Sequence, residues 1–284
     1  MKPGSVVAEN KLRELFGLSG RVAVVTGGAG LLGMKHAEAI AFAGGIPVLL
    51  DLPQACPDQK AKMLSSTLHC ESLGIAADIS NEQSIANARD QILEKFSRLD
   101  ILINNAANNP KMEAGTGKQW SRLENLSVDT WEADLRVGLT GAFLCSRVFG
   151  SEMARRRSGV IVNIASDLAL IGPDQRIYRK AGIPDLEQPV KPVTYSVVKS
   201  GLVGLTRYLA TYWADAGVRV NCISPGGVYN GQPADFVSKL QTLIPLGRMA
   251  HLDEYQGAML FLCSDASSYM TGSNLVVDGG RTCW

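Results

Sequence analysis

An uninterrupted apolar run that leads directly into glycines is the feature of this sequence that most constrains its fold. Residues 21–26 read RVAVVT, and a run this rich in β-branched residues favours a strand buried on both faces of a parallel sheet. The chain continues as TGGAGLLG, residues 26–33, and a helix is predicted to follow. Gly27, Gly30 and Gly33 allow a tight turn, close approach of a pyrophosphate and close packing of helix on strand.

An acidic residue at the end of the next predicted strand strengthens this interpretation. Residues 46–50 form that strand, and Asp51 follows it, near the distance of about 20 residues at which an acidic side chain meets the adenosine ribose. A glycine-rich turn without a ligand is the alternative, and the position of Asp51 argues against it. The turn and the start of the helix, with Leu31 and Leu32, are therefore predicted to bind a dinucleotide.

Strands and helices alternate along the rest of the chain. This rhythm predicts one α/β domain, residues 21–284, with a doubly wound parallel sheet of about seven strands. Residues 1–20 are interpreted as a polar leader and residues 172–192 as an insertion. The further strands are predicted near 74–77, 100–103, 160–165, 218–223 and 274–277, and the helices over about 58–70, 80–96, 128–156, 194–216 and 252–264.

Small and polar residues follow several of these strands. Asn105 and Ala106 come after residues 100–103, and Ser166 comes after residues 160–165. Pro225 and Gly226 follow the sixth strand in the same way. Ligands of doubly wound sheets bind at the carboxyl ends of the strands, so these residues are expected to lie together beside the nucleotide.

A tyrosine and a lysine in VTYSVVKSG, residues 193–201, are the candidate chemical groups. Tyr195 and Lys199 are four residues apart, which places both on one face of a helix. A phenol has a pKa of about 10, and an ammonium about 4 Å away favours the phenolate by roughly 4 kcal/mol at an effective dielectric of about 20. That corresponds to roughly three pKa units and would allow Tyr195 to exchange protons near neutral pH. Alone, the pair favours an ordinary helix surface, because chance pairs at this spacing are common.

Composition excludes several classes of partner. Lys plus Arg number 28 against 27 for Asp plus Glu, so no basic surface for nucleic acid or an anionic membrane is indicated. Neither a signal sequence nor a membrane-spanning run is visible, and we expect a soluble cytoplasmic protein with a small-molecule substrate. The six cysteines and three histidines are scattered, so neither disulfides nor a metal site is predicted.

Taken in order, these motifs resemble those of the short-chain dehydrogenases/reductases over about residues 21–280. The resemblance implies a single Rossmann-like domain that transfers a hydride between NAD(H) and a secondary alcohol or carbonyl. It also implies a homotetramer or homodimer formed through the helices at about 128–156 and 194–216. The motifs are Thr26-Gly27, Asn104-Asn105-Ala106, Ser166, Tyr195-x-x-x-Lys199, Pro225-Gly226 and Val277-Asp278-Gly279-Gly280.

The same resemblance implies roles for individual residues. Tyr195 is the general acid/base, Lys199 lowers its pKa and holds the nicotinamide ribose, and Ser166 hydrogen-bonds the reacting oxygen. Asp51 holds the adenosine ribose and would repel a 2′-phosphate, which no nearby Lys or Arg offsets, so NAD is expected rather than NADP. The remaining cofactor residues are Asp78 and Ile79 at the adenine, Asn230 at the carboxamide, and Asn105, Ala106, Pro225, Gly226 and Val228 along the cleft.

Three departures from the family pattern leave alternatives open. Leu31 stands where the main branch has glycine, and the interval from Ser166 to Tyr195 is long, as in sugar-nucleotide epimerases and dehydratases. Gly138 replaces the asparagine that completes the family's proton relay, so a non-catalytic nucleotide-binding homologue is the other alternative. A water-filled notch beside Lys199 is expected at Gly138, and Gly138→Asn is expected to preserve or raise the rate.

The insertion at residues 172–192 is predicted to form a wall or lid of the substrate site, because it connects Ser166 with Tyr195. Its polar and cationic side chains favour hydroxyl-rich or anionic ligands, with Arg176 and Tyr178 as substrate contacts beside Ser166 and Tyr195. The expected substrate is a sugar, sugar acid or sugar phosphate, and the insertion resembles that of bacterial surface-sugar dehydrogenases. The side chains in question are Gln175, Arg176, Tyr178, Arg179 and Lys180.

Overall fold

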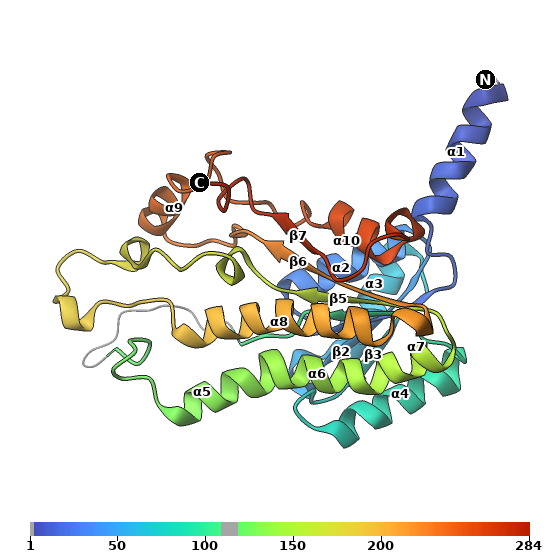
Figure 1. Ribbon diagram of the computed structural model, residues 1–284, viewed down its shortest axis with the longest axis horizontal. Coiled ribbons are helices and arrows are strands. Elements are labelled where there is room, and N and C mark those ends of the chain that lie inside the picture. The colour runs from blue at the N-terminus through green and yellow to red at the C-terminus, as the bar shows by residue number, and fades with distance from the viewer. Residues whose placement is uncertain (1–2, 109–118) are drawn as a thin grey trace.

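A computed structural model describes residues 3–108 and 119–284, with the side chains of residues 3–9 left out, and centres on a seven-stranded parallel sheet (Figure 1). The strand order is β3-β2-β1-β4-β5-β6-β7, so it reverses between β1 and β4. Doubly wound sheets bind their ligands at such a reversal. The strands are β1 (Val22–Thr26), β2 (Ile46–Asp51), β3 (Leu73–Ala76), β4 (Ile101–Asn104), β5 (Gly159–Ile164), β6 (Val218–Pro225) and β7 (Asn274–Val277).

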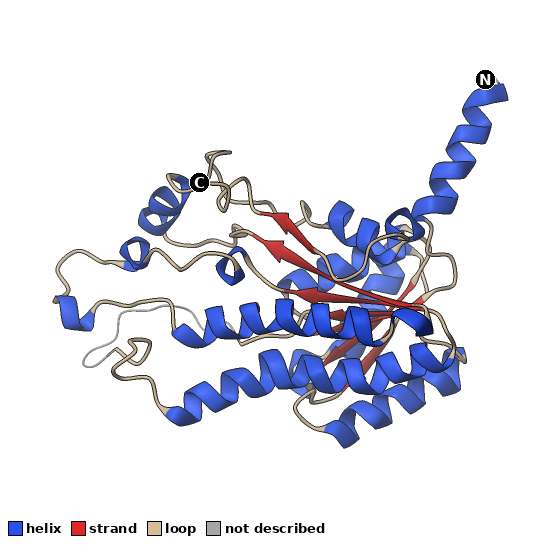
Figure 2. Cartoon of the chain, in the orientation of Figure 1, coloured by secondary structure: helices blue, strands red, loops and turns tan. Residues whose placement is uncertain are grey.

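Helices cover both faces of this sheet (Figure 2). One face packs against α4, α6, α7 and α8, and the other against α2, α3 and α10. The predicted fold class, a doubly wound sheet of seven strands, is confirmed. The helices are α1 (Pro3–Phe16), α2 (Leu31–Phe42), α3 (Pro57–Leu68), α4 (Glu82–Phe96), α5 (Val128–Leu135), α6 (Gly141–Cys145), α7 (Ser151–Arg155), α8 (Val193–Tyr212), α9 (Ala234–Gln241) and α10 (Gln256–Cys263).

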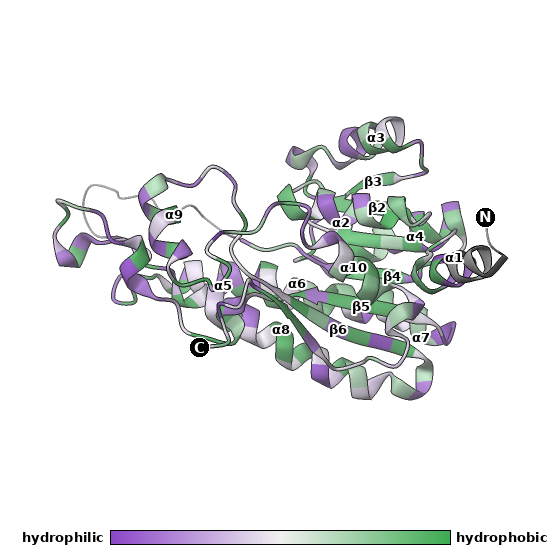
Figure 3. Cartoon of the chain, turned by 90° about the horizontal axis from the view of Figure 1, so that it is seen from above, coloured by the Kyte–Doolittle hydropathy of each residue, from purple (hydrophilic) through white to green (hydrophobic). Residues whose placement is uncertain are grey.

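The apolar character of β1 follows from its burial on both faces. Val22 and Val24 belong to the cluster on the α4 side, whereas Ala23 and Val25 belong to the cluster on the α2 side. Successive side chains of a strand point to opposite faces, so a central strand with two covered faces is apolar throughout. Figure 3 shows the hydrophobic colour along the inner strands.

A hydrogen-bonded polar network crosses the apolar core. Asn104 and Asn163 are partners in the register of β4 and β5, and Asn104 Nδ2 donates to Asn163 Oδ1 over 2.8 Å. Asn104 Nδ2 also donates to Ser146 Oγ, and Asn163 Nδ2 donates to Thr206 Oγ1 over 2.8 Å. Because Thr206 belongs to α8, the network fixes the helix that carries Tyr195 against the middle of the sheet.

The predicted long helix 128–156 is continuous from residue 128 to residue 155, but it contains two π-helical turns, Arg136–Thr140 and Ser146–Gly150. Gly138 lies buried in the first turn. A Cβ atom there would lie 2.5 Å from Val198 Cγ1 on α8. The expected water-filled notch is therefore wrong, because Val198 occupies the space beside Gly138.

Other differences from the prediction lie at the periphery. Residues 3–16 form α1, which projects from the body of the molecule, where a polar leader was expected (Figure 1). Helix α9 was not predicted. The insertion 172–192 packs on it, with buried Ile177 in one cluster with Leu240, so the insertion shares a small core of its own. No helix among the described residues is long and apolar enough to cross a membrane.

Candidate active site

A cavity of about 680 Å³ runs along the carboxyl edge of the sheet. Almost all of the predicted site residues line it, whereas Gly33 and Arg176 do not. The predicted residues at its surface are Gly27, Gly30, Leu31, Leu32, Asp51, Asp78, Ile79, Asn105, Ala106, Ser166, Tyr178, Tyr195, Lys199, Pro225, Gly226, Val228 and Asn230.

Two glycines of the turn after β1 are required by contacts that leave no room for a side chain. Gly27 has φ +61°, and a Cβ atom on it would lie 2.9 Å from Ala106 Cα. A Cβ atom on Gly33 would lie 2.1 Å from the Gly27 carbonyl oxygen, so Gly33 sets the packing of α2 on the turn. Gly30 precedes α2 and gives it no side-chain cap, and Leu31 and Leu32 of its first turn line the cavity. The first N–H groups of a helix have no partner within the helix, so this position fits a pyrophosphate.

Asn105 fastens this turn to the end of β4. Its Nδ2 donates to the carbonyl oxygens of Thr26 and Gly27 over 2.9 and 3.2 Å. In return, Thr26 Oγ1 accepts the backbone N–H groups of Asn105 and Ala106. These bonds hold the backbone of the turn in place, and the backbone is the part that would approach the phosphates.

Carboxylates stand at one end of the cavity, which we call the acidic end (Asp51 and Asp78). Asp51 Oδ2 accepts the N–H of Ala29 over 3.0 Å, and its Oδ1 accepts the N–H of Leu52 over 2.8 Å. Asp78 Oδ1 accepts the N–H of Ser80 over 2.8 Å. Both carboxylates are thus oriented by backbone groups, which keeps Asp51 beside the glycine-rich turn.

The loop after β6 is braced by Gln232, a residue that the sequence did not indicate. Its Oε1 accepts the N–H of Asn230 over 2.7 Å, and its Nε2 donates to the carbonyl oxygen of Val228 over 2.8 Å. Gln232 itself lines the cavity. The bracing fixes the loop that presents Val228 and Asn230.

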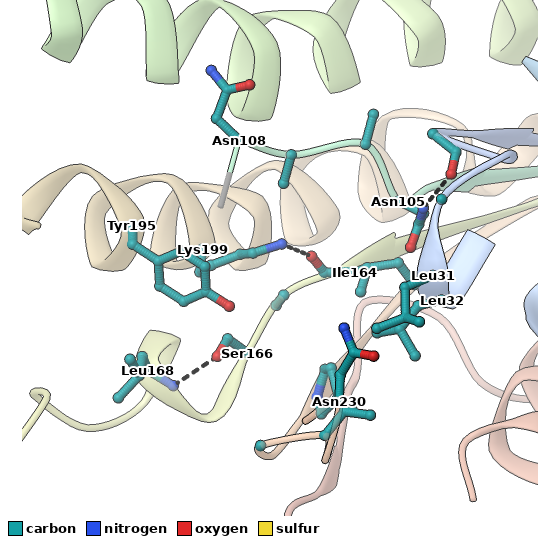
Figure 4. Close-up of a pocket in the computed structure, with 18 of the residues that line it drawn as sticks. Leu31, Leu32, Asn105, Asn108, Ile164, Ser166, Leu168, Tyr195, Lys199 and Asn230 are labelled. Atoms are coloured by element: carbon teal, nitrogen blue, oxygen red, sulfur yellow. Dashed lines mark hydrogen bonds between the residues drawn. The ribbon is translucent and has the colours of Figure 1, made fainter. Parts of the chain in front are cut away.

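Tyr195, Lys199 and Ser166 come together at the other end of the cavity, beyond the loops after β1 and β4 (Figure 4). Lys199 Nζ donates to the carbonyl oxygen of Ile164, the last residue of β5, over 2.7 Å. Ser166 Oγ donates to Asp167 Oδ1 over 2.7 Å and accepts the N–H of Leu168 over 3.2 Å. The geometry therefore unites the three candidate catalytic residues.

The charges around Tyr195 differ from the expectation. Burial raises the pKa of Tyr195; hydrogen bonding with Ser166 and the charge of Arg281 oppose this rise, and the charge of Asp167 adds to it. The lowered pKa expected from Lys199 alone is not observed, because desolvation outweighs the favourable interactions. Lys199 Nζ lies 5.8 Å from the centre of the Tyr195 ring, and its own pKa falls to about 8, through burial first and then the nearby Lys191 charge.

Three charged residues in this part of the cavity are not indicated by the sequence motifs: Asp167, Lys191 and Arg281. Arg281 Nη1 donates to Asp167 Oδ2 over 2.6 Å, and the two side chains are only 8% and 5% exposed. Lys191 Nζ lies 3.7 Å from the centre of the Tyr195 ring. Arg281 directly follows the VDGG motif, residues 277–280, which begins with the last residue of β7. This position at the carboxyl edge of the sheet is the one signal in the sequence that could have indicated Arg281.

The two arginines of the insertion, Arg176 and Arg179, lie outside the cavity. Arg176 pairs with Asp174 over 2.7 Å and is 83% exposed, and Arg179 pairs with Asp185 over 3.4 Å. Neither of them lines the cavity, so the predicted contact of Arg176 with substrate has no support in its position. Tyr178 does line the cavity, as predicted. Among the described residues, no group of three or more His, Cys, Asp or Glu is placed to hold a metal ion.

Comparison with known proteins identifies the family of this chain. The family model described as "short chain dehydrogenase" matches residues 21–179, and the one described as "Enoyl-(Acyl carrier protein) reductase" matches residues 185–282. A D-threitol dehydrogenase of Mycolicibacterium smegmatis is 34% identical, over 94% of this chain and 95% of that protein. An NAD-dependent glycerol dehydrogenase of Listeria innocua is 32% identical, over 94% and 96% respectively.

Solved structures give the same result. A gluconate 5-dehydrogenase from Burkholderia cenocepacia, solved in complex with NADP and tartrate, superposes with a TM-score of 0.83 at 26% identity. The match covers 96% of this chain and 99% of that one. With matching family models, relatives over nearly the full length and the Ser-Tyr-Lys geometry, the chain belongs to the short-chain dehydrogenase/reductase family.

Proposed function

We propose that this protein is an NAD-dependent oxidoreductase that transfers a hydride between the nicotinamide and a secondary hydroxyl of a polyol or sugar derivative. The observation that carries the proposal is the continuity of one cavity. It joins the glycine-rich turn and Asp51 at one end to Ser166, Tyr195 and Lys199 at the other. A dinucleotide and a small alcohol can therefore meet within it.

The residues of this chain would divide the chemistry as follows. A nicotinamide bound in the cavity would supply the acceptor for the hydride that the hydroxyl carbon of the substrate loses on oxidation, and Tyr195 would take the proton of the hydroxyl oxygen. Ser166 orients that oxygen, and Lys199, fixed by its bond to the Ile164 carbonyl, keeps a positive charge beside the phenolate. Reduction of a carbonyl reverses each of these steps.

The choice of NAD rests on charge at the acidic end. Asp51 can accept two ribose hydroxyls, whereas it would repel a 2′-phosphate. The cationic residues on the described cavity wall are Lys191, Lys199 and Arg281, and all three lie at the opposite end. A 2′-phosphate at Asp51 would therefore find no counter-charge from the wall. The glycerol dehydrogenase relative is NAD-dependent, and the gluconate 5-dehydrogenase was solved with NADP.

The substrate class is supported by the relatives and by the polarity of the cavity. The named relatives act on threitol and glycerol, and another, 32% identical, is a galactitol 2-dehydrogenase. Asp167, Tyr178, Lys191 and Arg281 give the substrate end several hydrogen-bonding groups, as hydroxyl-rich ligands require. These relatives are dehydrogenases, which favours hydride transfer over the epimerase or dehydratase alternative.

Nicotinamide absorbance tests the proposal directly. The protein is offered NAD or NADP with polyols, sugar acids, sugar phosphates, nucleotide sugars and apolar alcohols. Net NADH formation with polyols or sugar derivatives is expected, with the higher kcat/KM for NAD. Turnover of apolar alcohols alone would refute the substrate class. Tight NAD binding without turnover of any compound would favour the non-catalytic alternative that Gly138 suggests.

A further inference from the structure

Positive charge gathers around the substrate end of the cavity, which we call the cationic end (Lys191, Lys199 and Arg281). Asp167 is the carboxylate that faces these three cations on the described cavity wall. Asp51 and Asp78 belong to the acidic end, beyond the turn after β1. On the described wall itself the three cations therefore outnumber the one carboxylate, while Asp134 acts on Lys191 and Asp174 acts on Arg281 from outside that wall.

Asp167 holds Arg281 in place through one hydrogen bond, which leaves other N–H groups of the guanidinium without a partner in the described chain. Asp167 accepts three hydrogen bonds, from Ser166 Oγ, the N–H of Leu168 and Arg281 Nη1. Within the described chain, Nη1 is the only guanidinium nitrogen of Arg281 with a hydrogen-bond partner, and Nε is buried without one. A side chain 8% exposed that lines a cavity and keeps unused N–H groups is suited to a ligand oxygen.

Lys191 adds a second cation close to the reacting centre. Its ammonium lies over the Tyr195 ring, on the wall that also carries Lys199. Burial lowers the pKa of Lys191 to about 8, with Asp167 and Asp134 opposing, and the charge of Lys191 helps to lower the pKa of Lys199 to about 8. Two ammonium groups that are partly removed from water and repel each other gain stability from an anion between them.

We propose that the substrate carries an anionic group, a carboxylate or a phosphate, and that Lys191 and Arg281 bind this group while Asp167 holds Arg281 in position. The inference rests on the proposed function, because it names the class of hydroxyl compound oxidised at that site. The residues that would bind the anionic group also differ from those predicted from the sequence. The exposed arginines of the insertion do not bind it; Lys191, at the end of the insertion, and Arg281, after β7, do.

Matched compounds test this proposal. Each set contains a neutral polyol, the acid with the same carbon chain and the phosphate ester, for example glycerol, glycerate and glycerol phosphate, and then the four- to six-carbon counterparts. The quantity measured is the ratio of kcat/KM for the anionic compound to that for its neutral partner. We expect the wild-type ratio to exceed about ten for at least one anion, since hydrogen bonds to charged groups are the strong ones. The acid and ester arms distinguish carboxylate from phosphate.

Variants of Lys191 and Arg281 test whether these two residues cause the preference for anionic substrates. Lys191→Met and Arg281→Met are each expected to lower the ratio by about tenfold, whereas Arg176→Met, an exposed cation of the same insertion, should leave it unchanged. The ratio cancels any effect of Lys191 on Tyr195 that is common to both compounds. Arg281→Met leaves Asp167 buried without its partner, so Arg281→Lys and the Lys191 variant keep the test valid if that protein does not fold.

Calorimetry gives a readout that does not depend on turnover. Binding of the same acids and esters is measured on the NAD complex of Tyr195→Phe, with and without Lys191→Met. Weaker binding of anions in the Lys191 variant supports the proposal. Equal turnover of neutral and anionic compounds, unchanged in ratio by the variants, overturns it and leaves the proposed function standing. Turnover of apolar alcohols alone, without anion binding, refutes both.

Discussion

At the acidic end of the cavity Asp51 is the last residue of β2 and Asp78 follows β3, whereas the cationic end draws on segments that lie far apart in the chain. Asp51 is held by backbone N–H groups of its own loop and of the neighbouring turn. Arg281, in contrast, is held by the side chain of Asp167, 114 residues earlier. One end is defined by local backbone geometry, and the other by tertiary contacts between side chains.

This difference indicates how the two ends can vary. The glycine-rich turn tolerates little change, because a Cβ atom at Gly27 or Gly33 would collide with backbone atoms. The insertion 172–192 and α9 share a separate small core, so they can change without disturbing the sheet. The cofactor-binding part is therefore expected to be the constant part of the site, and the substrate-binding part the adaptable one.

The largest effect should come from a substitution at the cationic end that stops the chemical step but leaves cofactor binding at the acidic end intact. Tyr195→Phe removes the proton acceptor, so kcat should fall by about 10²–10⁴-fold or below detection. The Kd for NAD, measured by fluorescence titration, should change little, because Asp51 and the glycine-rich turn are untouched. Wild-type turnover in this variant would show that Tyr195 is not the acid/base.

A change at the acidic end should alter cofactor choice and leave the chemistry intact. Asp51→Ala removes a repulsion with a 2′-phosphate of roughly 1–4 kcal/mol. The ratio of kcat/KM for NAD to that for NADP should fall about tenfold or more. Asp51→Asn is the control, because an amide oxygen can still accept the N–H of Ala29 without the charge. A wild-type protein that prefers NADP would contradict the assignment of Asp51.

A substitution at Gly138 tests the packing of the long helix, residues 128–155, against α8. Gly138→Ala places a methyl group 2.5 Å from Val198 Cγ1, and such overpacking costs about 1–3 kcal/mol. The free energy of unfolding in urea should fall accordingly, although a helix-interior alanine opposes the loss by about 1 kcal/mol. Val198→Ala should restore most of the stability in the double variant. Additive effects of the two changes would show that Val198 does not fill the space.

The smallest effect concerns the pH profile. Oxidation needs deprotonated Tyr195, so its rate should rise as pH passes upward through the Tyr195 pKa in the working complex. The charge of Asp167 raises this pKa, and Asp167→Asn should therefore move the rise to lower pH. Asp51→Asn, at the other end of the cavity, should leave the profile in place. A shift to higher pH in the Asp167 variant would contradict this account of the charges.

The sequence predicted the sheet and the placement of Asp51, Ser166, Tyr195 and Lys199 along one cavity, because each depends on local patterns. A β-branched run followed by glycines indicates strand and turn whatever the rest of the chain does, and four-residue spacing places Tyr195 and Lys199 on one helix face. The positions of Lys191 and Arg281 could not be predicted in this way. Whether a cation on a polar segment faces solvent, as Arg176 does, or a cavity depends on tertiary packing that no local pattern records.

Gly138 is a second example of a feature that depends on tertiary packing and cannot be predicted from a local pattern. The sequence correctly predicts its place in a long helix, but the absence of a side chain does not by itself predict an open space. Whether such a space exists depends on the element that packs there. The branched side chain of Val198 on α8 fills the space beside Gly138 in the π-helical turn.

The pairing of Asn104 with Asn163 has a consequence for how the sheet assembles. Parallel strands must find their register over long loops, and a slip of one residue turns every side chain to the opposite face. The amides meet only when β4 and β5 align as they do here, residue 104 against residue 163. In a slipped alignment both amides would lose this bond inside an apolar core, which disfavours misregistered intermediates. Replacing both with valine should therefore yield a chain that collapses readily but refolds into a mixture of alignments.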